Sequence, residues 1–364
     1  MTMLQSGLRP GATIGIIGGG QLARMLSIAA SRFGFKTLIL EPQADCPAAQ
    51  TANQQIIAPY DDIVALEQLT KNCDVITYEF ENIPASAIKF LAQQKAIVAP
   101  NPLALEVSQD RIVEKEFLTK NGIKTAPFYQ VDTIEDLANG LNKINGKGIL
   151  KTRRFGYDGK GQVRLENASE KDMLAALNDI AHAPAVLEGF VAFEKEISVI
   201  AARGFNSEIA FFDCAENVHK NGILHTSTVP ASVAKTTQDA AHNIAKIILQ
   251  ALDYVGVIGV EFFVLDDGSL LVNEIAPRVH NSGHWTEAAC LISQFEQHIR
   301  AVSGLPLAST IRHSNCVMEN LIGEDVQNLP EILKEKQTLI HLYGKAETRK
   351  GRKMGHVTRI TPKA

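Results

Sequence analysis

Hydrophobic positions along the first hundred residues follow two alternating patterns. Short runs of apolar and β-branched residues predict strands, and apolar residues spaced three and four apart between them predict helices. The strands are expected at 13–17, 36–40, 75–78 and 96–98, and the helices at 21–33, 61–69 and 84–93. Alternation of this kind is typical of a parallel sheet with right-handed crossovers. We therefore expect a Rossmann-like domain over residues 1–108.

The pattern becomes that of a mixed α and β region after about residue 109. Helices are expected at 110–120, 169–179, 237–252 and 286–302. Strands are expected at 148–151, 163–165, 186–191, 196–202, 209–212, 257–265 and 269–275. We expect one α+β domain over 109–305 and a small mixed β subdomain over 306–364.

Composition narrows the class of protein. Apolar residues make up 45% and charged residues 21%, which is ordinary for a folded globular chain. The net charge of −4 argues against nucleic-acid binding, which needs a basic surface. Five scattered cysteines without a Cys-x-x-Cys pair indicate a reducing compartment. Because the sequence shows neither a signal peptide nor an apolar run of ~20 residues, we expect a cytoplasmic protein that does not contact membranes.

A glycine-rich turn follows the first expected strand. Residues 18–23 read Gly-Gly-Gly-Gln-Leu-Ala, and Glu41 ends the next strand. In dinucleotide sites such glycines let backbone N–H groups approach a phosphate, and an acid about 20 residues later binds the ribose. A tight turn without a nucleotide has the same glycines. A nicotinamide-dependent oxidoreductase is therefore one alternative at this point.

A second glycine-rich segment lies at 151–162 and reads Lys-Thr-Arg-Arg-Phe-Gly-Tyr-Asp-Gly-Lys-Gly-Gln. Its glycines can fold backbone amides over phosphate oxygens, while Lys151 and Lys160 supply positive charge. It is not a Walker A sequence, because no Lys-Ser or Lys-Thr follows the glycines. We favour phosphate binding over a flexible basic hairpin.

The expected hairpin around Asp267-Gly268 makes a geometric prediction. With these two residues as the turn, Leu265 pairs with Leu270, Phe263 with Val272, and Glu261 with Glu274. Two carboxylates ~5 Å apart at Cβ repel one another unless a cation lies between them. We therefore predict magnesium, with Asn273 adding a neutral oxygen. A protonated glutamate or a slipped register is the alternative.

Other polar segments give weaker signals. The loop at 276–286 places Arg278, which could hold a phosphate, near His280, which could relay protons. Glu188 and Glu196 lie near strand ends and could bind a nucleoside. The last twenty residues hold seven Lys or Arg and one acid, which suits a phosphate-bearing substrate or a solvated tail.

Together these motifs resemble the ATP-grasp ligases, and among them the 5-(carboxyamino)imidazole ribonucleotide synthases of purine biosynthesis. The likeness covers nearly the whole chain, and the segments that carry it are 14–22, 78–83, 151–162, 273–286 and 351–356. It implies a pre-ATP-grasp domain, an ATP-grasp domain with a lid over about 125–190, and a C-terminal substrate-side subdomain.

The resemblance also implies a reaction. ATP would phosphorylate bicarbonate to carboxyphosphate, and the amine of 5-aminoimidazole ribonucleotide would then be carboxylated, with release of ADP and phosphate. The implied partners are these small molecules, magnesium and a second copy of the chain in a homodimer. An ATP-grasp ligase that acts on a different amine is the nearest alternative.

Roles for individual residues follow from the same resemblance. Those on the ATP side are Arg111, Lys151, Gly156, Tyr157, Asp158, Gly159, Lys160, Gly161, Gln162, Glu188, Gly189, Phe190, Val191, Glu196, His219, Asn273 and Glu274. Glu261 and Glu274 would hold the metal. Those on the ribonucleotide side are Gln21, Glu79, Arg278, His280, Asn281, Lys345, Arg352 and Lys353. Those that would take part in the chemistry are Arg278, His280, Lys353, Asp158 and Tyr157.

Overall fold

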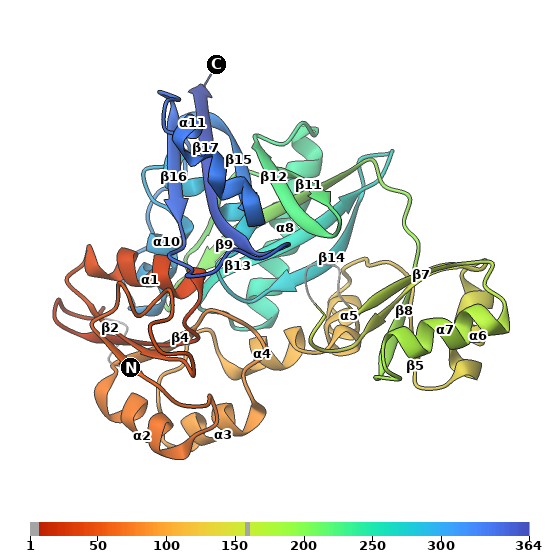
Figure 1. The fold of residues 1–364 in the computed structure, drawn as a ribbon, viewed down its shortest axis with the longest axis horizontal. Coiled ribbons are helices and arrows are strands. Elements are labelled where there is room, and N and C mark those ends of the chain that lie inside the picture. Colours follow the sequence, from red (N-terminus) through yellow and green to blue (C-terminus); the bar gives the residue numbers. More distant parts are fainter. Residues whose placement is uncertain (1–6, 157–160, 364) are drawn as a thin grey trace.

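The computed structural model describes residues 7–156 and 161–363, and these residues form three sheets (Figure 1). The first sheet is parallel, in the order β3-β2-β1-β4. Its strands are β1 (Thr13–Ile17), β2 (Lys36–Leu40), β3 (Gln54–Ile56) and β4 (Val75–Tyr78). The strand expected at 96–98 is only a single bridge between Ile76 and Val98. Pro100 follows two residues later, and proline within sheets is confined to edge strands and strand ends.

Helices cover both faces of this sheet. The helix α1 (Gln21–Ser31) packs on one face and also contacts α10 (Gln294–Val302). The helices α2 (Ile63–Asn72) and α3 (Ala85–Gln93) pack on the other face. This arrangement agrees with the predicted Rossmann-like domain, and it brings the carboxyl ends of β1 and β4 to one edge.

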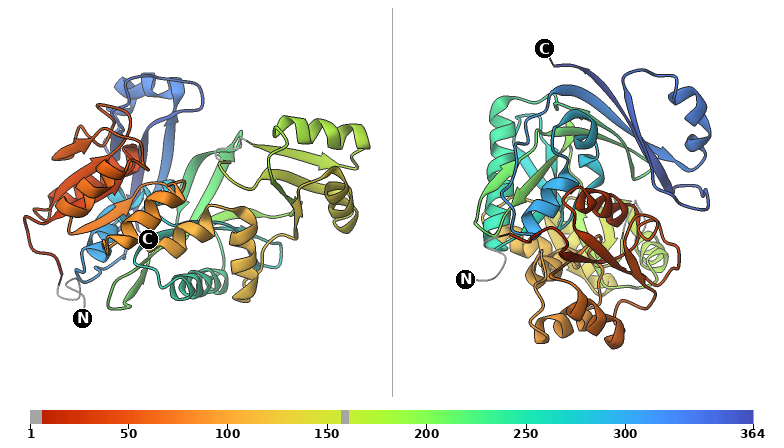
Figure 2. Two further views of the ribbon diagram at one scale, coloured as in Figure 1. Left: turned by 90° about the horizontal axis from the view of Figure 1, so that it is seen from below. Right: turned by 90° about the vertical axis from the view of Figure 1, so that its left-hand side faces the viewer.

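The second sheet forms the part that projects from the rest of the molecule in Figures 1 and 2. Its order is β5-β8-β6-β7, and every neighbouring pair is antiparallel. The strands are β5 (Phe128–Val131), β6 (Lys147–Thr152), β7 (Gln162–Glu166) and β8 (Ala185–Gly189). The helices α6 (Ile134–Lys143) and α7 (Glu170–Asp179) each begin with a capping box, and their apolar residues form a separate small core with this sheet.

The third sheet is the centre of the molecule and has nine strands. Its main path runs β14-β13-β9-β11-β12-β15-β17-β16, with β10 beside β9. The strands are β9 (Lys195–Arg203), β10 (Ile209–Phe211), β11 (Ala215–Lys220), β12 (Ile223–Val229), β13 (Gly256–Val264), β14 (Leu270–Ala276), β15 (Ser314–Ile322), β16 (Thr338–Leu342) and β17 (Lys353–Pro362). The last three strands belong to the C-terminal part of the chain, so this part extends the central sheet.

Some helices pack against the central sheet, and others connect it to the first and second sheets. The helix α8 (Lys235–Ala251) contacts β9, β13 and β14, and α10 contacts β13 and β9. The connection from the first domain consists of α4 (Pro102–Ser108) and α5 (Arg111–Lys120). Short helical turns complete the fold: η2 (Asn281–Gly283), α9 (Thr286–Ala289), η3 (Gly323–Asn328) and α11 (Leu329–Ile332).

The single helix expected at 286–302 is wrong, because the chain breaks between α9 and α10. Ser293 caps the start of α10 by accepting a hydrogen bond from the backbone N–H of Glu296, and Cys290 forms a bridge with Arg312. Cap formation by serine competes with continuation of the preceding helix.

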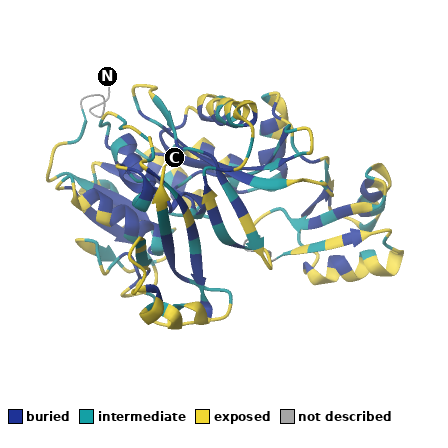
Figure 3. Ribbon diagram, turned by 90° about the horizontal axis from the view of Figure 1, so that it is seen from above, coloured by how far each residue is buried: buried dark blue, intermediate teal, exposed yellow. Residues whose placement is uncertain are grey.

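Burial follows the same division (Figure 3). Buried residues are concentrated in the first and central sheets and on the inner faces of their helices, whereas the projecting sheet is more exposed. The strand β14 lies at one end of the central sheet, and two of its outward N–H groups are satisfied from outside the sheet. Val272 donates to the carbonyl of Lys124 at 2.9 Å, and Ile275 donates to Glu114 Oε1 at 2.5 Å. Within the described ranges, no helix has both the length and the apolar character needed to cross a bilayer.

Candidate active site

A cavity of about 610 Å³ lies where the three sheets meet. Residues from all three sheets and their connections line it. The predicted site residues among them are Gln21, Glu79, Arg111, Lys151, Gly156, Gln162, Glu196, His219, Glu261, Asn273, Glu274, Arg278, His280, Asn281 and Lys353. Tyr157, Asp158, Gly159 and Lys160 lie outside the described residues. The remaining predicted residues do not line the cavity; they are Gly161, Glu188, Gly189, Phe190, Val191, Lys345 and Arg352.

The hairpin of β13 and β14 places Glu261 opposite Glu274, as predicted. The turn itself differs from the prediction. Leu265 donates its N–H to the carbonyl of Ser269, so the loop holds three residues, and Phe263 pairs with Leu271. The expected pairs of Phe263 with Val272 and of Leu265 with Leu270 are therefore wrong.

A β-bulge restores the register between the turn and the glutamates. It lies next to Glu261, where Asn273 is the extra residue on β14. A bulge bends the strand and re-aims its side chains. As a result, the consecutive residues Asn273 and Glu274 both line the cavity.

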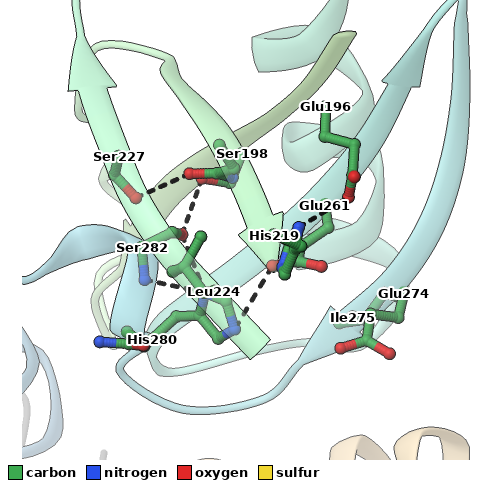
Figure 4. Close-up of polar contacts among 12 residues, drawn as sticks. Glu196, Ser198, His219, Leu224, Ser227, Glu261, Glu274, Ile275, His280 and Ser282 are labelled. Carbon is green, nitrogen blue, oxygen red and sulfur yellow. Dashed lines mark hydrogen bonds and ion pairs between the residues drawn. The ribbon is translucent and has the colours of Figure 1, made fainter. Parts of the chain in front are cut away.

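The electrostatics of the two facing glutamates are unequal. Burial and then the charge of Glu274 raise the pKa of Glu261 to about 7. Burial also acts to raise the pKa of Glu274, but the positive charges of Arg111 and Lys151 outweigh it and lower that pKa. Arg111 Nη1 lies 3.4 Å from Glu274 Oε2. Figure 4 shows the two glutamates on neighbouring strands, with Glu261 beside His219 and on the side of His280.

The donor set at this pair suits a hard divalent cation. It consists of two carboxylates and the nearby amide of Asn273. Among the residues that the structure describes, no group of three or more His, Cys, Asp or Glu could form a metal cage. Magnesium is commonly held by only one or two carboxylates together with substrate phosphates. The residues present therefore fit magnesium that arrives with a nucleotide.

A buried ion triad lies beside the predicted nucleotide side. Glu188 accepts a hydrogen bond from Lys151 Nζ at 3.0 Å, and its other oxygen lies 3.3 Å from Lys115 Nζ. Burial alone would raise the pKa of Glu188, but the two ammonium groups lower it to about 2. The side chain of Glu188 is therefore engaged by lysines. The predicted contact of residues 188–191 with a nucleoside remains a prediction.

On the opposite wall, His219 and Glu196 form a pair, with His219 Nδ1 3.0 Å from Glu196 Oε2. Although burial acts to lower the pKa of His219, the bond to Glu196 raises it. Two aromatic rings that the sequence did not single out, those of Phe193 and Phe263, stack with centroids 4.6 Å apart and also line the cavity. They give this wall an apolar surface of the kind that a planar base requires.

The side of the cavity toward the first domain carries Arg278 and His280. Arg278 Nε and Nη2 donate to the two carboxylate oxygens of Glu81, at 2.7 and 3.3 Å. Burial, followed by the charge of Arg278, lowers the pKa of His280 to about 3, so its imidazole is neutral. Its Nδ1 lies 2.8 Å from Ser282 Oγ, and its Nε2 lies 3.6 Å from Glu261 Oε1. This last contact is not an ion pair between a charged imidazole and Glu261.

Three further predicted residues form supporting contacts. Asn281 exchanges two amide hydrogen bonds with Asn320, at 2.9 and 2.8 Å. Lys345 Nζ donates to the carbonyl of Lys353 at 2.7 Å, and Arg352 donates to the carbonyl of Glu347 at 3.0 Å. Lys353 lines the cavity, whereas Lys345 and Arg352 contact the chain around it.

The glycine turn at 18–20 is filled by carboxylates of the same chain. Glu41 accepts from the N–H of Gly19 at 3.0 Å, and Glu79 accepts from the N–H groups of Gly20 and Ala23. A Cβ on Gly20 would lie 2.6 Å from Glu79 Oε1, which explains the glycine. The backbone donors that a dinucleotide phosphate would need are therefore occupied, and the nicotinamide alternative is wrong.

Family models match three consecutive parts of the chain. They are a ribonucleotide synthetase preATP-grasp domain at residues 11–109, an ATP-grasp domain at 116–295, and a phosphoribosylaminoimidazole carboxylase C-terminal domain at 316–364. The N5-carboxyaminoimidazole ribonucleotide synthase of Brucella melitensis is 63% identical over 361 residues, which cover 99% of each chain. This chain belongs to the N5-carboxyaminoimidazole ribonucleotide synthase family.

Other relatives agree with this membership. The N5-carboxyaminoimidazole ribonucleotide synthase of Bacillus subtilis is 44% identical over 96% of this chain and 91% of its own. Among solved structures, an N5-carboxyaminoimidazole synthetase from Staphylococcus aureus with ADP has a TM-score of 0.92 and 42% identity, covering 98% of this chain and 94% of that one. An enzyme of the family from Aspergillus clavatus, with ADP and 5-aminoimidazole ribonucleotide, has a TM-score of 0.90 and 31% identity, with 97% and 94% covered.

These findings confirm the predicted ATP-grasp resemblance and fold. Several cavity residues were nevertheless missed by the sequence reasoning, namely Glu81, Gln109, Glu114, Arg153, Phe193 and Phe263. Of these, Glu114 had a usable signal. It lies three residues after Arg111 on the same helix, so the two side chains lie on the same helix face. A site at Arg111 therefore predicts that Glu114 lies close to it.

Proposed function

We propose that this chain catalyses the ATP-dependent carboxylation of 5-aminoimidazole ribonucleotide by bicarbonate. The observation that carries the proposal is the pair of facing carboxylates, Glu261 and Glu274, in a cavity that has cationic side chains at both ends. Arg111 and Lys151 lie on the side toward the projecting sheet, and Arg278 and Lys353 line the cavity on its other side. Such a site suits two anionic substrates that react with one another.

The first step is phosphoryl transfer. A bicarbonate oxygen forms a bond to the γ-phosphorus of ATP, the bond to the bridging oxygen breaks, and ADP leaves. Arg111 and Lys151 bind the phosphate oxygens and offset the charge of the transferred group. Magnesium, when held by Glu261 and Glu274, would neutralise phosphate charge in this step. Phe193 and Phe263 offer the stacking surface for the adenine.

The second step forms the carbon–nitrogen bond. The exocyclic amine nitrogen attacks the carboxyl carbon, inorganic phosphate leaves, and the amine loses a proton. Arg278 and Lys353 hold the anionic groups of the ribonucleotide and of carboxyphosphate. His280 is neutral because it is buried beside Arg278, and in this form its Nε2 can take part in a hydrogen bond near the reacting atoms. The roles of Tyr157 and Asp158 belong to this step as predictions from the resemblance.

Further parts of the proposal rest on the resemblance and the composition. The protein works in the cytoplasm as a homodimer of three-domain subunits, divided at about residues 108 and 305. Analytical ultracentrifugation of the full chain measures the assembly state directly, and a monomer at micromolar concentration would contradict the dimer.

An ADP-release assay tests the reaction. We expect magnesium-dependent ADP formation that needs bicarbonate and is increased by 5-aminoimidazole ribonucleotide. Carbon from labelled bicarbonate should appear in a product with an acid-labile carbamate. If 5-aminoimidazole ribonucleotide leaves the rate of ADP formation unchanged while another amine increases it, the chain is a different ATP-grasp ligase.

A further inference from the structure

A chain of hydrogen bonds links the segment that follows β6, beside the predicted nucleotide side, to the Arg278 end of the cavity without passing through Glu261 or Glu274. It begins at Arg154, three residues after Lys151, continues through the side-chain amide of Gln109, and ends at the pair formed by Glu81 and Arg278. We propose that Gln109 is a positioning residue that couples the binding of ATP to the binding of the ribonucleotide. The proposal rests on the function proposed above.

The amide of Gln109 makes three hydrogen bonds. Its Oε1 accepts from Arg154 Nη2 at 2.7 Å, and its Nε2 donates to the carbonyls of Glu81 and Ile83, at 2.7 and 2.8 Å. Only one orientation of the amide satisfies all three partners, because a guanidinium only donates and a carbonyl only accepts. Gln109 is 9% exposed, so its loss leaves two carbonyls in a largely dry environment without their donor.

At the ribonucleotide end, these two carbonyls belong to Glu81 itself and to Ile83, in the loop that carries the Glu81 side chain. The Glu81 carboxylate receives the Arg278 guanidinium in a forked contact, at 2.7 and 3.3 Å. A forked contact fixes the plane of the guanidinium as well as its position. Any displacement of the Glu81 loop is therefore passed to Arg278, which lines the cavity.

At the nucleotide end, Gln109 lies in a segment tied to the end of β6. The next residue, Asp110, accepts from Arg153 Nε at 3.0 Å and from Nη2 at 2.8 Å. The N–H of Arg111 donates to the carbonyl of Arg153 at 3.0 Å. Arg111 and Lys151, the proposed phosphate ligands, thus belong to the same two segments as Gln109 and Arg154. ATP that fixes these segments also fixes Gln109.

Binding of two ligands through a shared element is reciprocal, so either ligand can report the coupling. We would measure the Kd of 5-aminoimidazole ribonucleotide by calorimetry, with and without a non-hydrolysable ATP analogue and Mg²⁺. In the native sequence we expect the nucleotide to tighten ribonucleotide binding about fivefold or more. In Gln109→Met and Arg154→Met we expect the factor to fall below about twofold.

Two further variants sharpen the test. Gln109→Glu keeps an acceptor for Arg154 but loses both N–H donors, so it should lose the coupling like Gln109→Met. Lys171→Met is the matched control, because it removes an exposed cation from α7, in the same projecting part of the chain but outside the relay. In Lys171→Met, the nucleotide analogue should tighten ribonucleotide binding by the same factor as in the native protein.

The proposal is overturned if the native protein shows no coupling, or if Gln109→Met keeps the native factor. If Gln109→Met fails to fold, Arg154→Met decides, because Arg154 is exposed and its removal leaves the core intact. Arg154→Met should weaken the binding of each ligand in the presence of the other by the same factor, with the melting temperature almost unchanged because Arg154 is exposed. A purely structural role would lower the melting temperature and leave the coupling factor at its native value. Failure of the proposed function is distinct, since the native protein would then form no ribonucleotide-dependent ADP.

Discussion

Replacing Glu261 by glutamine should stabilise the nucleotide-free protein while abolishing its activity. Glu261 is buried opposite Glu274, and burial together with that second charge raises its pKa from 4.5 to about 7. One pKa unit corresponds to about 1.4 kcal/mol, so the ionised carboxylate destabilises the fold by roughly 3 kcal/mol. Glutamine has nearly the same shape and carries no charge, so it removes this repulsion.

The sign of the pH dependence follows from linkage. The folded protein holds the Glu261 proton more tightly than the unfolded chain does, because the folded-state pKa is the higher one. The protonated Glu261 side chain therefore makes its full contribution to the free energy of unfolding below the unfolded-state pKa of about 4.5. This contribution is lost as the pH rises through the folded-state pKa of about 7. The difference between Glu261→Gln and the native protein should grow over the same range and level off above it.

Melting temperatures measured in a metal chelator, from about pH 5 to about pH 8.5, test this expectation. At the alkaline end the variant should melt about 5 °C or more above the native protein. A change of 1 kcal/mol in stability shifts the melting temperature of a domain of roughly 150–250 residues by about 2–4 °C. Glu216→Gln is the matched control: Glu216 pairs with Lys195 and faces no carboxylate, so its replacement should not raise the melting temperature. A Glu261→Gln variant that melts at or below the native value near pH 8.5 would refute the reasoning.

The remaining expectations concern individual charges. Glu274→Gln should abolish magnesium-dependent ADP release, and near-normal turnover would contradict the metal assignment. Lys353→Ala should raise the KM for the ribonucleotide at least tenfold more than the KM for ATP, as judged by initial rates, whereas equal effects would remove its substrate-side role. Lys115→Met should destabilise the fold by about 2 kcal/mol and raise the KM for ATP, because Glu188 then pairs with Lys151 alone; unchanged thermal melting and an unchanged KM would count against the triad.

Local sequence patterns were sufficient for the parts of the fold built from neighbouring residues. The facing glutamates could be predicted because a hairpin has a period of two and a turn signal close by. The prediction survived an error in the turn, since the bulge at Asn273 compensated for the longer loop. By contrast, β3 escaped detection because its sequence, Gln-Gln-Ile, is short and largely polar.

The missed site residues depend on long-range contacts. Glu81 acquires its role from Arg278, which lies 197 positions later, and no local spacing marks that partner. The glycine turn illustrates the same limit. Its shape could be predicted, but the group that fills it, Glu79, directly follows β4 and lies 59 positions from Gly20. The local sequence predicts that the backbone N–H groups of this turn can bind an anion. The tertiary structure determines that this anion is the carboxylate of Glu79.

The position of β14 at the end of the central sheet has a consequence for how this enzyme behaves at high concentration. An uncovered terminal strand is a template on which extended segments of other molecules can add, and this is a route to aggregation. Here the helix α5 and the chain after it occupy the outward amides of Val272 and Ile275. The strand that carries Glu274 is thereby shielded from intermolecular pairing at these positions, so Glu274 can lie on an outermost strand without exposing the protein to self-association there.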